Sequence, residues 1–105
     1  MDYKYKAKVL RVIDGDTVVF SIDCGFKIKY EAECRFYGID TPELRKKDQK
    51  GAALVSKKWV EDNIGTEVVI YSKEIDKYGR PLVVVYQGDL NLNEKLIELG
   101  LAVKY

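Results

Sequence analysis

The chain has 105 residues, about the length of one domain, of which 47% are hydrophobic and 33% charged. This composition is not that of a disordered chain, and no apolar run approaches the roughly 20 residues that cross a bilayer. The net charge of +1 excludes an evenly polybasic nucleic-acid binder but leaves room for local basic patches. The first 15 residues lack the apolar segment of a signal peptide, and cellular location is left open.

The sequence contains no histidine, which removes Ser-His-Asp and Cys-His catalysis as well as histidine-ligated zinc. Two cysteines, Cys24 and Cys34, are too few for a zinc site or a disulfide scaffold. A disulfide between them would cross a hairpin at mismatched depth, so we predict two free thiols. Chemistry must therefore come from carboxylates, cationic side chains, hydroxyls or a hard metal ion.

The first half of the chain predicts three strands. Residues 5–13 alternate in polarity, Asp14-Gly15 favours a turn, and residues 17–22 are rich in β-branched side chains. Gly25 indicates a second turn, after which residues 26–37 predict the third strand. Residues 38–43 then leave the sheet, because Pro42 biases Thr41 towards an extended conformation.

The second half predicts a helix, two strands and a second helix. In residues 49–63 the positions of Ala52, Val55, Trp59 and Val60 fit a helix, and Gly65 favours its end. Residues 66–71 and 81–86 predict strands joined by a loop over residues 76–80. Asn91 and Glu94 form a capping-box pattern for a short helix that Gly100 ends. Its predicted apolar stripe consists of Leu92, Leu96 and Leu99.

Five short strands with a helix after the third and a short helix near the C-terminus are typical of an α+β protein built on a five-stranded OB-fold barrel. No internal repeat, low-complexity tract or linker interrupts the pattern, so we expect one domain over residues 1–105. Such barrels often bind oligonucleotides or oligosaccharides, although the fold alone does not fix the function.

Basic residues are concentrated at the start of the first predicted helix. Six of them lie between positions 45 and 58, against Asp48 alone: Arg45, Lys46, Lys47, Lys50, Lys57 and Lys58. Such a run is usually a solvated helix face. The alternative is a rim that attracts phosphate groups.

Three short segments concentrate reactive side chains at strand ends and loops: residues 13–17 (IDGDT), 35–43 (RFYGIDTPE) and 76–82 (DKYGRPL). Each has a structural explanation taken singly, as a turn, a helix start or a hairpin loop. Together and in this order they resemble the staphylococcal nuclease, or thermonuclease, family. The resemblance runs from about Ala7 to Lys104 and includes Asn93-Glu94 and Gly100-Leu101-Ala102 near the end of the chain.

The resemblance implies a calcium-dependent nuclease that hydrolyses phosphodiester bonds of DNA and RNA with low sequence specificity and leaves 3′-phosphate ends. In this interpretation Asp16, Asp40 and the backbone carbonyl of Thr41 hold Ca²⁺, and an all-oxygen donor set does suit calcium or magnesium. Asp14 is expected to support the turn as a hydrogen-bond acceptor rather than to bind the metal. We also expect Asp16, Asp40 and Glu43 to converge.

The resemblance also implies roles for the cationic and aromatic residues. Arg35 and Arg80 match the arginines that stabilise negative charge on the reacting phosphate, for which a guanidinium fork is suited. Glu43 matches the residue that orients or deprotonates the attacking water. Lys77 and Tyr78 match contacts to a terminal phosphate. Tyr105 is a further substrate-site candidate, although it is slightly out of register with the family's tyrosine.

Two departures from the family pattern would reshape the rim of the site: a longer hairpin between Thr17 and Arg35 and a shorter loop between Glu43 and Ala52. The family's third helix has no counterpart in the printed sequence. We expect a monomer acting on single-stranded or frayed DNA and RNA, without a membrane. The alternatives are a non-catalytic nucleic-acid-binding module and a structural protein-interaction domain. The presence of Asp16, Arg35, Asp40, Glu43 and Arg80 together favours the enzyme.

Overall fold

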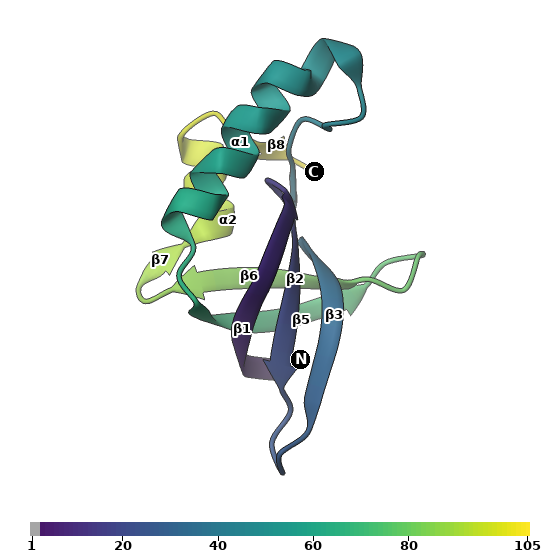
Figure 1. The fold of residues 1–105 in the computed structure, drawn as a ribbon, viewed down its shortest axis with the longest axis vertical. Helices are drawn as coiled ribbons and strands as arrows, with labels where there is room; N and C mark the ends of the chain where they lie inside the picture. The colour runs from purple at the N-terminus through teal and green to yellow at the C-terminus, as the bar shows by residue number, and fades with distance from the viewer. Residues whose placement is uncertain (1–2) are drawn as a thin grey trace.

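The computed structural model describes residues 3–105; Met1 and Asp2, the start of the predicted domain, lie outside the described residues. Five longer strands form an antiparallel sheet in the order β3-β2-β1-β5-β6. The sheet closes on itself where β3 and β6 pair in parallel, at Arg35 with Leu82 and Phe36 with Val83. The predicted five-stranded barrel is confirmed (Figure 1). Its strands are β1 (Tyr3–Asp14), β2 (Thr17–Asp23), β3 (Lys29–Phe36), β5 (Glu67–Ile75) and β6 (Pro81–Gln87).

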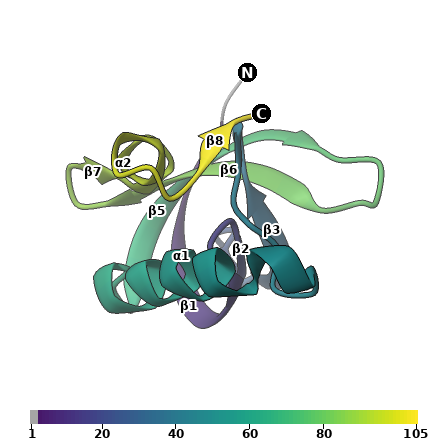
Figure 2. The same cartoon turned by 90° about the horizontal axis from the view of Figure 1, so that it is seen from above.

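Three two-residue strands and the helices complete the fold, and α1, α2 and β8 lie at one end of the barrel (Figure 1 and Figure 2). β4 pairs with β8 near the C-terminus, and β7 extends the sheet beside β6. A 3₁₀ turn leads into the first helix. The helix begins at Lys50 and ends at Asn63, which confirms the predicted helix over residues 49–63 to within one residue. These elements are β4 (Ile39–Asp40), η1 (Lys47–Gln49), α1 (Lys50–Asn63), β7 (Leu90–Asn91), α2 (Leu92–Glu98) and β8 (Val103–Lys104).

The predicted inner face of α1 is wrong in part. Ala52 and Val55 are exposed, whereas Ala53, Ser56 and Val60 are buried and Trp59 is half-buried. The face is set by a polar contact, because the Ser56 hydroxyl donates a 2.7 Å hydrogen bond to the Leu101 carbonyl oxygen.

The close approach of α1 to the β1–β2 turn also fixes this face. A Cβ atom at Gly15 would come within 2.8 Å of the Ser56 Cβ atom, closer than non-bonded carbon atoms approach one another. Gly15 therefore serves close packing.

The third strand begins later than predicted, at Lys29 rather than at residue 26. Gly25, Phe26 and Lys27 all have positive φ, and the Cys24 N–H donates to the Ile28 carbonyl oxygen at 2.9 Å. The left-handed conformation is unusual for two non-glycine residues, and the β2–β3 ladder ends where this loop begins, at the pair of Asp23 with Lys29. Phe26 points away from the barrel and is 97% exposed.

The second helix begins as predicted, with the Asn91 side chain accepting a hydrogen bond from the Glu94 N–H at 3.1 Å. Leu92 and Leu96 are buried, but Leu99 is exposed because it lies at the C-terminal cap, beyond the last helical residue. Gly100 has a φ of 75° and reverses the chain there, which fits its predicted role as the end of the helix.

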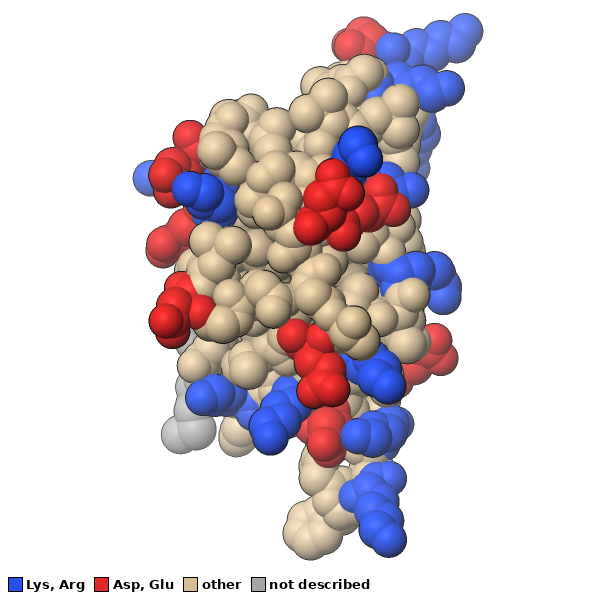
Figure 3. All heavy atoms as spheres, turned by 60° about the vertical axis from the view of Figure 1, so that its left-hand side comes forward, with Lys and Arg blue, Asp and Glu red and all other residues tan. Residues whose placement is uncertain are grey.

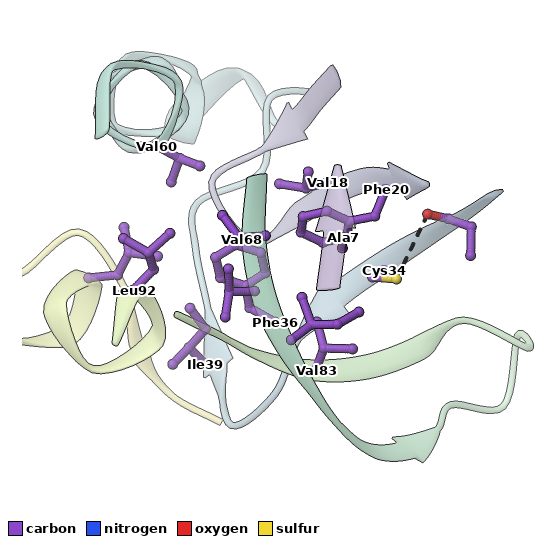
Figure 4. Close-up of a cluster of buried hydrophobic side chains, with 14 of the residues drawn as sticks. Ala7, Val18, Phe20, Cys34, Phe36, Ile39, Val60, Val68, Val83 and Leu92 are labelled. Atoms are coloured by element: carbon purple, nitrogen blue, oxygen red, sulfur yellow. Dashed lines mark hydrogen bonds between the residues drawn. The ribbon is translucent and has the colours of Figure 1, made fainter. Parts of the chain in front are cut away.

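One hydrophobic cluster fills the barrel and extends under both helices, where Val60 of α1 and Leu92 of α2 reach it (Figure 4). Both cysteines are free thiols, as predicted. Cys24 is exposed, whereas Cys34 is part of the cluster, and burial raises the pKa of its thiol to about 12. Within residues 3–105, neither helix has the length and apolar character required to cross a bilayer.

Candidate active site

The three reactive segments meet at one end of the barrel around a hollow of about 570 Å³, here called the active hollow. β1 and β2 supply Asp14 and Asp16 at their shared turn, and the seam strand β3 supplies Arg35. The β5–β6 loop closes the opposite side. Eight of the predicted site residues line this hollow: Asp16, Arg35, Asp40, Glu43, Lys77, Tyr78, Arg80 and Tyr105. Thr41 lies just behind it.

Asp16 is the most enclosed carboxylate of the site, only 6% exposed. Its Oδ2 accepts a hydrogen bond from the Thr41 N–H at 3.2 Å, and its Oδ1 accepts one from the Thr17 hydroxyl at 3.0 Å. The contact to Thr41 joins the β1–β2 turn to the segment after β4. Two segments that are 25 residues apart in the chain are thereby fixed against each other.

Arg35 lies between the two aspartates that were predicted to bind metal. Its Nη2 is 2.9 Å from Asp40 Oδ1 and 3.6 Å from Asp16 Oδ2. The guanidinium carbon lies 4.8 Å from the centre of the Tyr105 ring, which is within the range of a cation–π contact. Tyr105 reaches this position because β8 pairs with β4 and the Tyr105 N–H donates to the Gly38 carbonyl oxygen.

Arg80 is held on the opposite side by Asp76, a residue that sequence analysis placed in the motif without a role. Asp76 Oδ2 accepts a 2.9 Å hydrogen bond from Arg80 Nε, and Asp76 Oδ1 accepts from the backbone N–H groups of Tyr78 and Arg80. These bonds hold the pKa of Asp76 below its usual value, the Arg80 N–H contributing most. An aspartate at the start of a glycine-containing loop is a known turn signal and could have identified this role.

Glu43 is fixed at both its backbone and its side chain. Its N–H donates to Gln49 Oε1 at 3.0 Å, and Arg45 Nε donates to its Oε2 at the same distance. The Arg45 hydrogen bond is the main reason that the pKa of Glu43 is lowered. Because Arg45 is an exposed side chain, this ion pair is of the kind that contributes little stability.

The basic run of residues 45–58 contributes partly to a solvated helix face and partly to the rim of the site, the two interpretations that its sequence allowed. Arg45 reaches the rim of the active hollow, whereas Lys58 pairs with Asp62 on the outer face of the helix at 3.5 Å. Lysine and arginine atoms gather at the top of the molecule, at the height where α1 begins, with acidic atoms beside them (Figure 3). Arg45 is the one residue of the run that lines the active hollow, and the charges of Lys46 and Lys57 act on Glu43 and Asp14 from outside it.

Negative charge accumulates on one wall of the active hollow, here called the acidic wall: Asp14, Asp16, Asp40 and Glu43. The pKa of Asp14 is raised, first by burial and then by the charges of Asp16 and Glu43. Asp14 has no hydrogen bond to its side chain among those found in the described residues, so its predicted role as a turn acceptor is not visible.

The acidic wall fits a hard cation in its chemistry, since every donor is oxygen and the charges repel. The Thr41 hydroxyl oxygen beside Asp16 is buried and lacks a hydrogen-bond partner within residues 3–105. The expected convergence of Asp16, Asp40 and Glu43 is not seen, because no three acidic or sulfur-bearing side chains of the described chain group closely enough to hold a metal. Arg35 and Arg45 instead engage Asp40 and Glu43.

Comparison with known proteins identifies relatives across most of the chain. The model of the family described as "Staphylococcal nuclease homologue" matches residues 33–105. The chain is 36% identical over 101 residues to a thermonuclease of Staphylococcus hyicus, a match that covers 90% of this chain and 56% of that protein. A thermonuclease of Staphylococcus intermedius is 36% identical over 100 residues, with the same coverage.

A micrococcal nuclease of Shigella flexneri is 28% identical over 110 residues, covering 96% of this chain and 59% of that protein. The chain therefore spans a little over half the length of these curated relatives. The family match covers the end of β3, the segment after β4, the Arg80 loop and Tyr105, which line the active hollow, whereas the β1–β2 turn that supplies Asp14 and Asp16 lies before it. This chain belongs to the staphylococcal nuclease homologue family.

Proposed function

We propose that this protein is a calcium-dependent nuclease that hydrolyses phosphodiester bonds of DNA and RNA strands with little base specificity. The observation that carries the proposal is the pairing of two arginines, Arg35 and Arg80, with an acidic wall around one hollow. The family relationship supports the same activity. By family resemblance, the products carry 3′-phosphate ends.

The arginines bind the phosphate and stabilise the negative charge that develops on it. All the hydrogen bonds of the Arg35 guanidinium in the described chain come from Nη2, so its other donors remain for phosphate oxygens. Arg80 approaches from a different element and is oriented by Asp76. A phosphate between the two would meet cationic groups from two sides of the hollow.

Asp16, Asp40 and Thr41 are the residues that would hold calcium. Asp16 is already fixed by the Thr41 N–H, and it belongs to the wall whose mutual repulsion a cation would relieve. The chemistry that such an ion supplies, when bound, is positive charge against the charge developing on the phosphate. Asp40 is bonded to Arg35 in this structure, so it has to share or exchange that partner.

Glu43 orients the attacking water. Its backbone is anchored to Gln49, which keeps the carboxylate at the mouth of the hollow. The hydrogen bond from Arg45 lowers the pKa of Glu43 and weakens it as a base, so hydrogen bonding to the water is the role that its present environment favours. Exchange of the exposed Arg45 for water or substrate would make the carboxylate more basic.

Lys77, Tyr78 and Tyr105 contact the substrate strand around the reacting phosphate. Lys77 Nζ lies 5.2 Å from the centre of the Tyr78 ring, so a cation and a hydroxyl-bearing ring are presented together at the tip of the loop. Tyr105 lies against Arg35 and forms the opposite edge. The contacts assigned to these three side chains are to phosphates or to the faces of bases, and such contacts carry no base specificity.

The proposal is tested by digesting single-stranded DNA, double-stranded DNA and RNA with millimolar calcium and, in parallel, with a chelator. We expect cleavage only with calcium, and end analysis should find 3′-phosphates. Strand binding without cleavage in calcium would instead identify a non-catalytic nucleic-acid-binding module. Cleavage that is equally fast in the chelator would overturn the metal dependence.

A further inference from the structure

A second hollow, of about 730 Å³, lies on the barrel beside α2, and its lining includes four tyrosines and two lysines. It is bordered by β5, β6, α2 and the β4–β8 pair. Of these, β5, β6, α2 and β8 lie next to one another in Figure 2. We call it the tyrosine groove and define it by six of its residues: Tyr37, Tyr71, Lys73, Tyr86, Lys104 and Tyr105. The proposed catalytic chemistry makes no use of it apart from Tyr105.

The tyrosine groove is continuous with the active hollow. A connecting hollow, also of about 730 Å³, shares Arg35, Arg80 and Tyr105 with the active hollow. It shares Tyr37 and Tyr105 with the tyrosine groove. Among the described residues, Tyr105 alone lines all three hollows. A chain-like ligand could therefore pass from the arginines, across Tyr105, into the tyrosine groove.

The rings of the groove are held in fixed positions. Tyr71 and Tyr86 pack edge to face with their centres 5.5 Å apart, and the Tyr86 hydroxyl accepts a hydrogen bond from Asn91 Nδ2 at 3.3 Å. Lys73 Nζ lies 5.8 Å from the centre of the Tyr37 ring. Tyr37 is 40% exposed, so an aromatic surface with a cation beside it is open to solvent.

These features suit an unpaired polynucleotide strand better than an apolar peptide. Rings offer a stacking surface to any base, and lysines beside them attract the phosphates of the same strand. Lys73 and Lys104 outnumber the single acidic residue of the lining, Glu94. A base inside a duplex is stacked on both faces already, so only an unpaired base gains by entering the groove.

We propose that the tyrosine groove binds the bases of a single strand that extend away from the reacting phosphate, so that the protein grips several successive nucleotides. This inference rests on the proposed nuclease function for the position of the reacting phosphate. It adds a substrate preference: unpaired strands several nucleotides long bind more tightly than dinucleotides, because they alone reach Tyr71 and Tyr86.

The test measures affinity for fluorescent oligothymidylates of two, four and eight nucleotides, in a chelator that prevents cleavage. The wild type should bind the longest strand most tightly. Tyr71→Leu should weaken binding of the eight-nucleotide strand by about fivefold or more, the lower end of one lost stacking contact, and leave the dinucleotide unchanged. Tyr30→Leu is the matched control, because Tyr30 is an exposed tyrosine of β3 outside all three hollows.

A second probe separates stacking from charge. Abasic linkers at the nucleotides farthest from the bound end should reproduce the loss seen with Tyr71→Leu, and they should cost nothing further in that variant. If thermal melting shows that Tyr71→Leu does not fold, Lys104→Gln replaces it, since Lys104 is an exposed residue of the short β8 strand. The Lys104→Gln variant should reduce the salt dependence of binding for the eight-nucleotide strand only.

Equal affinity for all three lengths would overturn the proposal, as would an equal loss for long and short strands in Tyr71→Leu. Self-association that buries the groove, seen as a mass that rises with concentration and falls back in Tyr71→Leu, would overturn it too. Cleavage of the eight-nucleotide strand in calcium is measured separately. Cleavage without a length effect refutes the groove alone, and a length effect without cleavage refutes only the nuclease.

Discussion

The two sides of the active hollow are built in different ways. The acidic wall belongs to the barrel: Asp16 is buried, is bonded to Thr41 across 25 residues of chain and shares Arg35 with Asp40. The Arg80 loop is organised locally, because Asp76 accepts hydrogen bonds from residues two and four positions further along. Folding the barrel therefore positions one side, whereas a short stretch of sequence positions the other.

The charge balance of the two sides is also opposite. Burial and neighbouring carboxylates raise the pKa of Asp14 on the acidic wall. Hydrogen bonds to backbone and side-chain donors lower the pKa of Asp76 in the loop. Asp14 thus carries a charge that its surroundings disfavour, although Arg35 and Arg45 engage Asp40 and Glu43 on the same wall. The charge of Asp76 is instead satisfied by hydrogen bonds. A cation should act on the first side and a phosphate on the arginine of the second.

The largest expected effect separates catalysis from folding on the loop side. Arg80→Ala should lower kcat by at least about 100-fold, the scale for losing one electrostatic donor in the transition state. Its melting temperature should stay close to that of the wild type, because Asp76 keeps its backbone hydrogen bonds. Steady-state cleavage of DNA measures the rate. Arg11→Ala, an exposed arginine outside the site, is the control, and near-normal turnover of Arg80→Ala would remove Arg80 from the mechanism.

A second prediction divides the roles within the acidic wall. Glu43→Gln keeps the shape of the side chain but removes its charge, so the cleavage rate should fall steeply while calcium affinity falls modestly. Asp40→Asn should weaken calcium binding more strongly than Glu43→Gln does. Calcium titrations and single-turnover rates provide both values, with Glu61→Gln on the exposed face of α1 as the control. The opposite ranking of calcium affinities would overturn this division.

Calcium should stabilise the fold through the acidic wall. Binding to the folded state alone adds about 2.7 kcal/mol at a hundredfold excess over Kd, a melting shift on the order of 10 °C for a domain of this size. Asp40→Asn should lose most of that shift. Its metal-free melting temperature should change little, because the ion pair of Asp40 with Arg35 is half-exposed. Thermal melts of both proteins at saturating millimolar calcium decide the matter, and a wild type without a shift would contradict a metal site here.

The smallest effects concern the pH dependence of stability. Removing an aspartate charge should raise the melting temperature on the acidic wall and lower it in the Arg80 loop. The raised pKa of Asp14 means that the folded state binds its proton more tightly, so the unfolding free energy falls as pH rises through the interval above 3.8. Asp14→Asn removes this penalty and should raise the melting temperature at neutral pH. The advantage should shrink as the pH is lowered towards 3.8.

Asp76 should behave in the opposite way. Its pKa is lowered in the folded state, so its contribution to stability is present above the usual value of 3.8 and is lost as the pH falls through the folded-state pKa. Asp76→Asn should therefore lower the melting temperature at neutral pH and cost progressively less in acid. Melting curves between pH 3 and pH 8 compare the two variants. Shifts of the same sign would erase the contrast between the acidic wall and the loop.

Sequence patterns predict those helices and strands that are determined by residues close to one another in the chain. The β-branched run of β2 and the Asn91–Glu94 cap identified their elements because a strand face and a helix start depend on local periodicity and hydrogen bonding. The inner face of α1 escaped prediction because the hydrogen bond of Ser56 to Leu101 spans 45 residues. The tip of the β2–β3 hairpin escaped it because Phe26 and Lys27 adopt positive φ without being glycine.

The site divides in the same way. Its three motifs are local, so their eight predicted site residues could be named from the sequence, and seven of them line one hollow together with Tyr105. The partners of those residues depend on the folded barrel. Arg35 lies between Asp16 and Asp40 because β3 pairs in parallel with β6 and because the segment after β4 packs against the β1–β2 turn.

The parallel pairing of β3 with β6 has a consequence for motion. The barrel closes there through only two pairs, Arg35 with Leu82 and Phe36 with Val83, and Arg80 lies two residues before Leu82. A phosphate held by both Arg35 and Arg80 would link the two strands across this pairing. Amide hydrogens of these strand ends should therefore exchange slowly when a nucleotide is bound and faster when the hollow is empty. The exchange rate of each amide at these strand ends would then indicate whether a strand is bound.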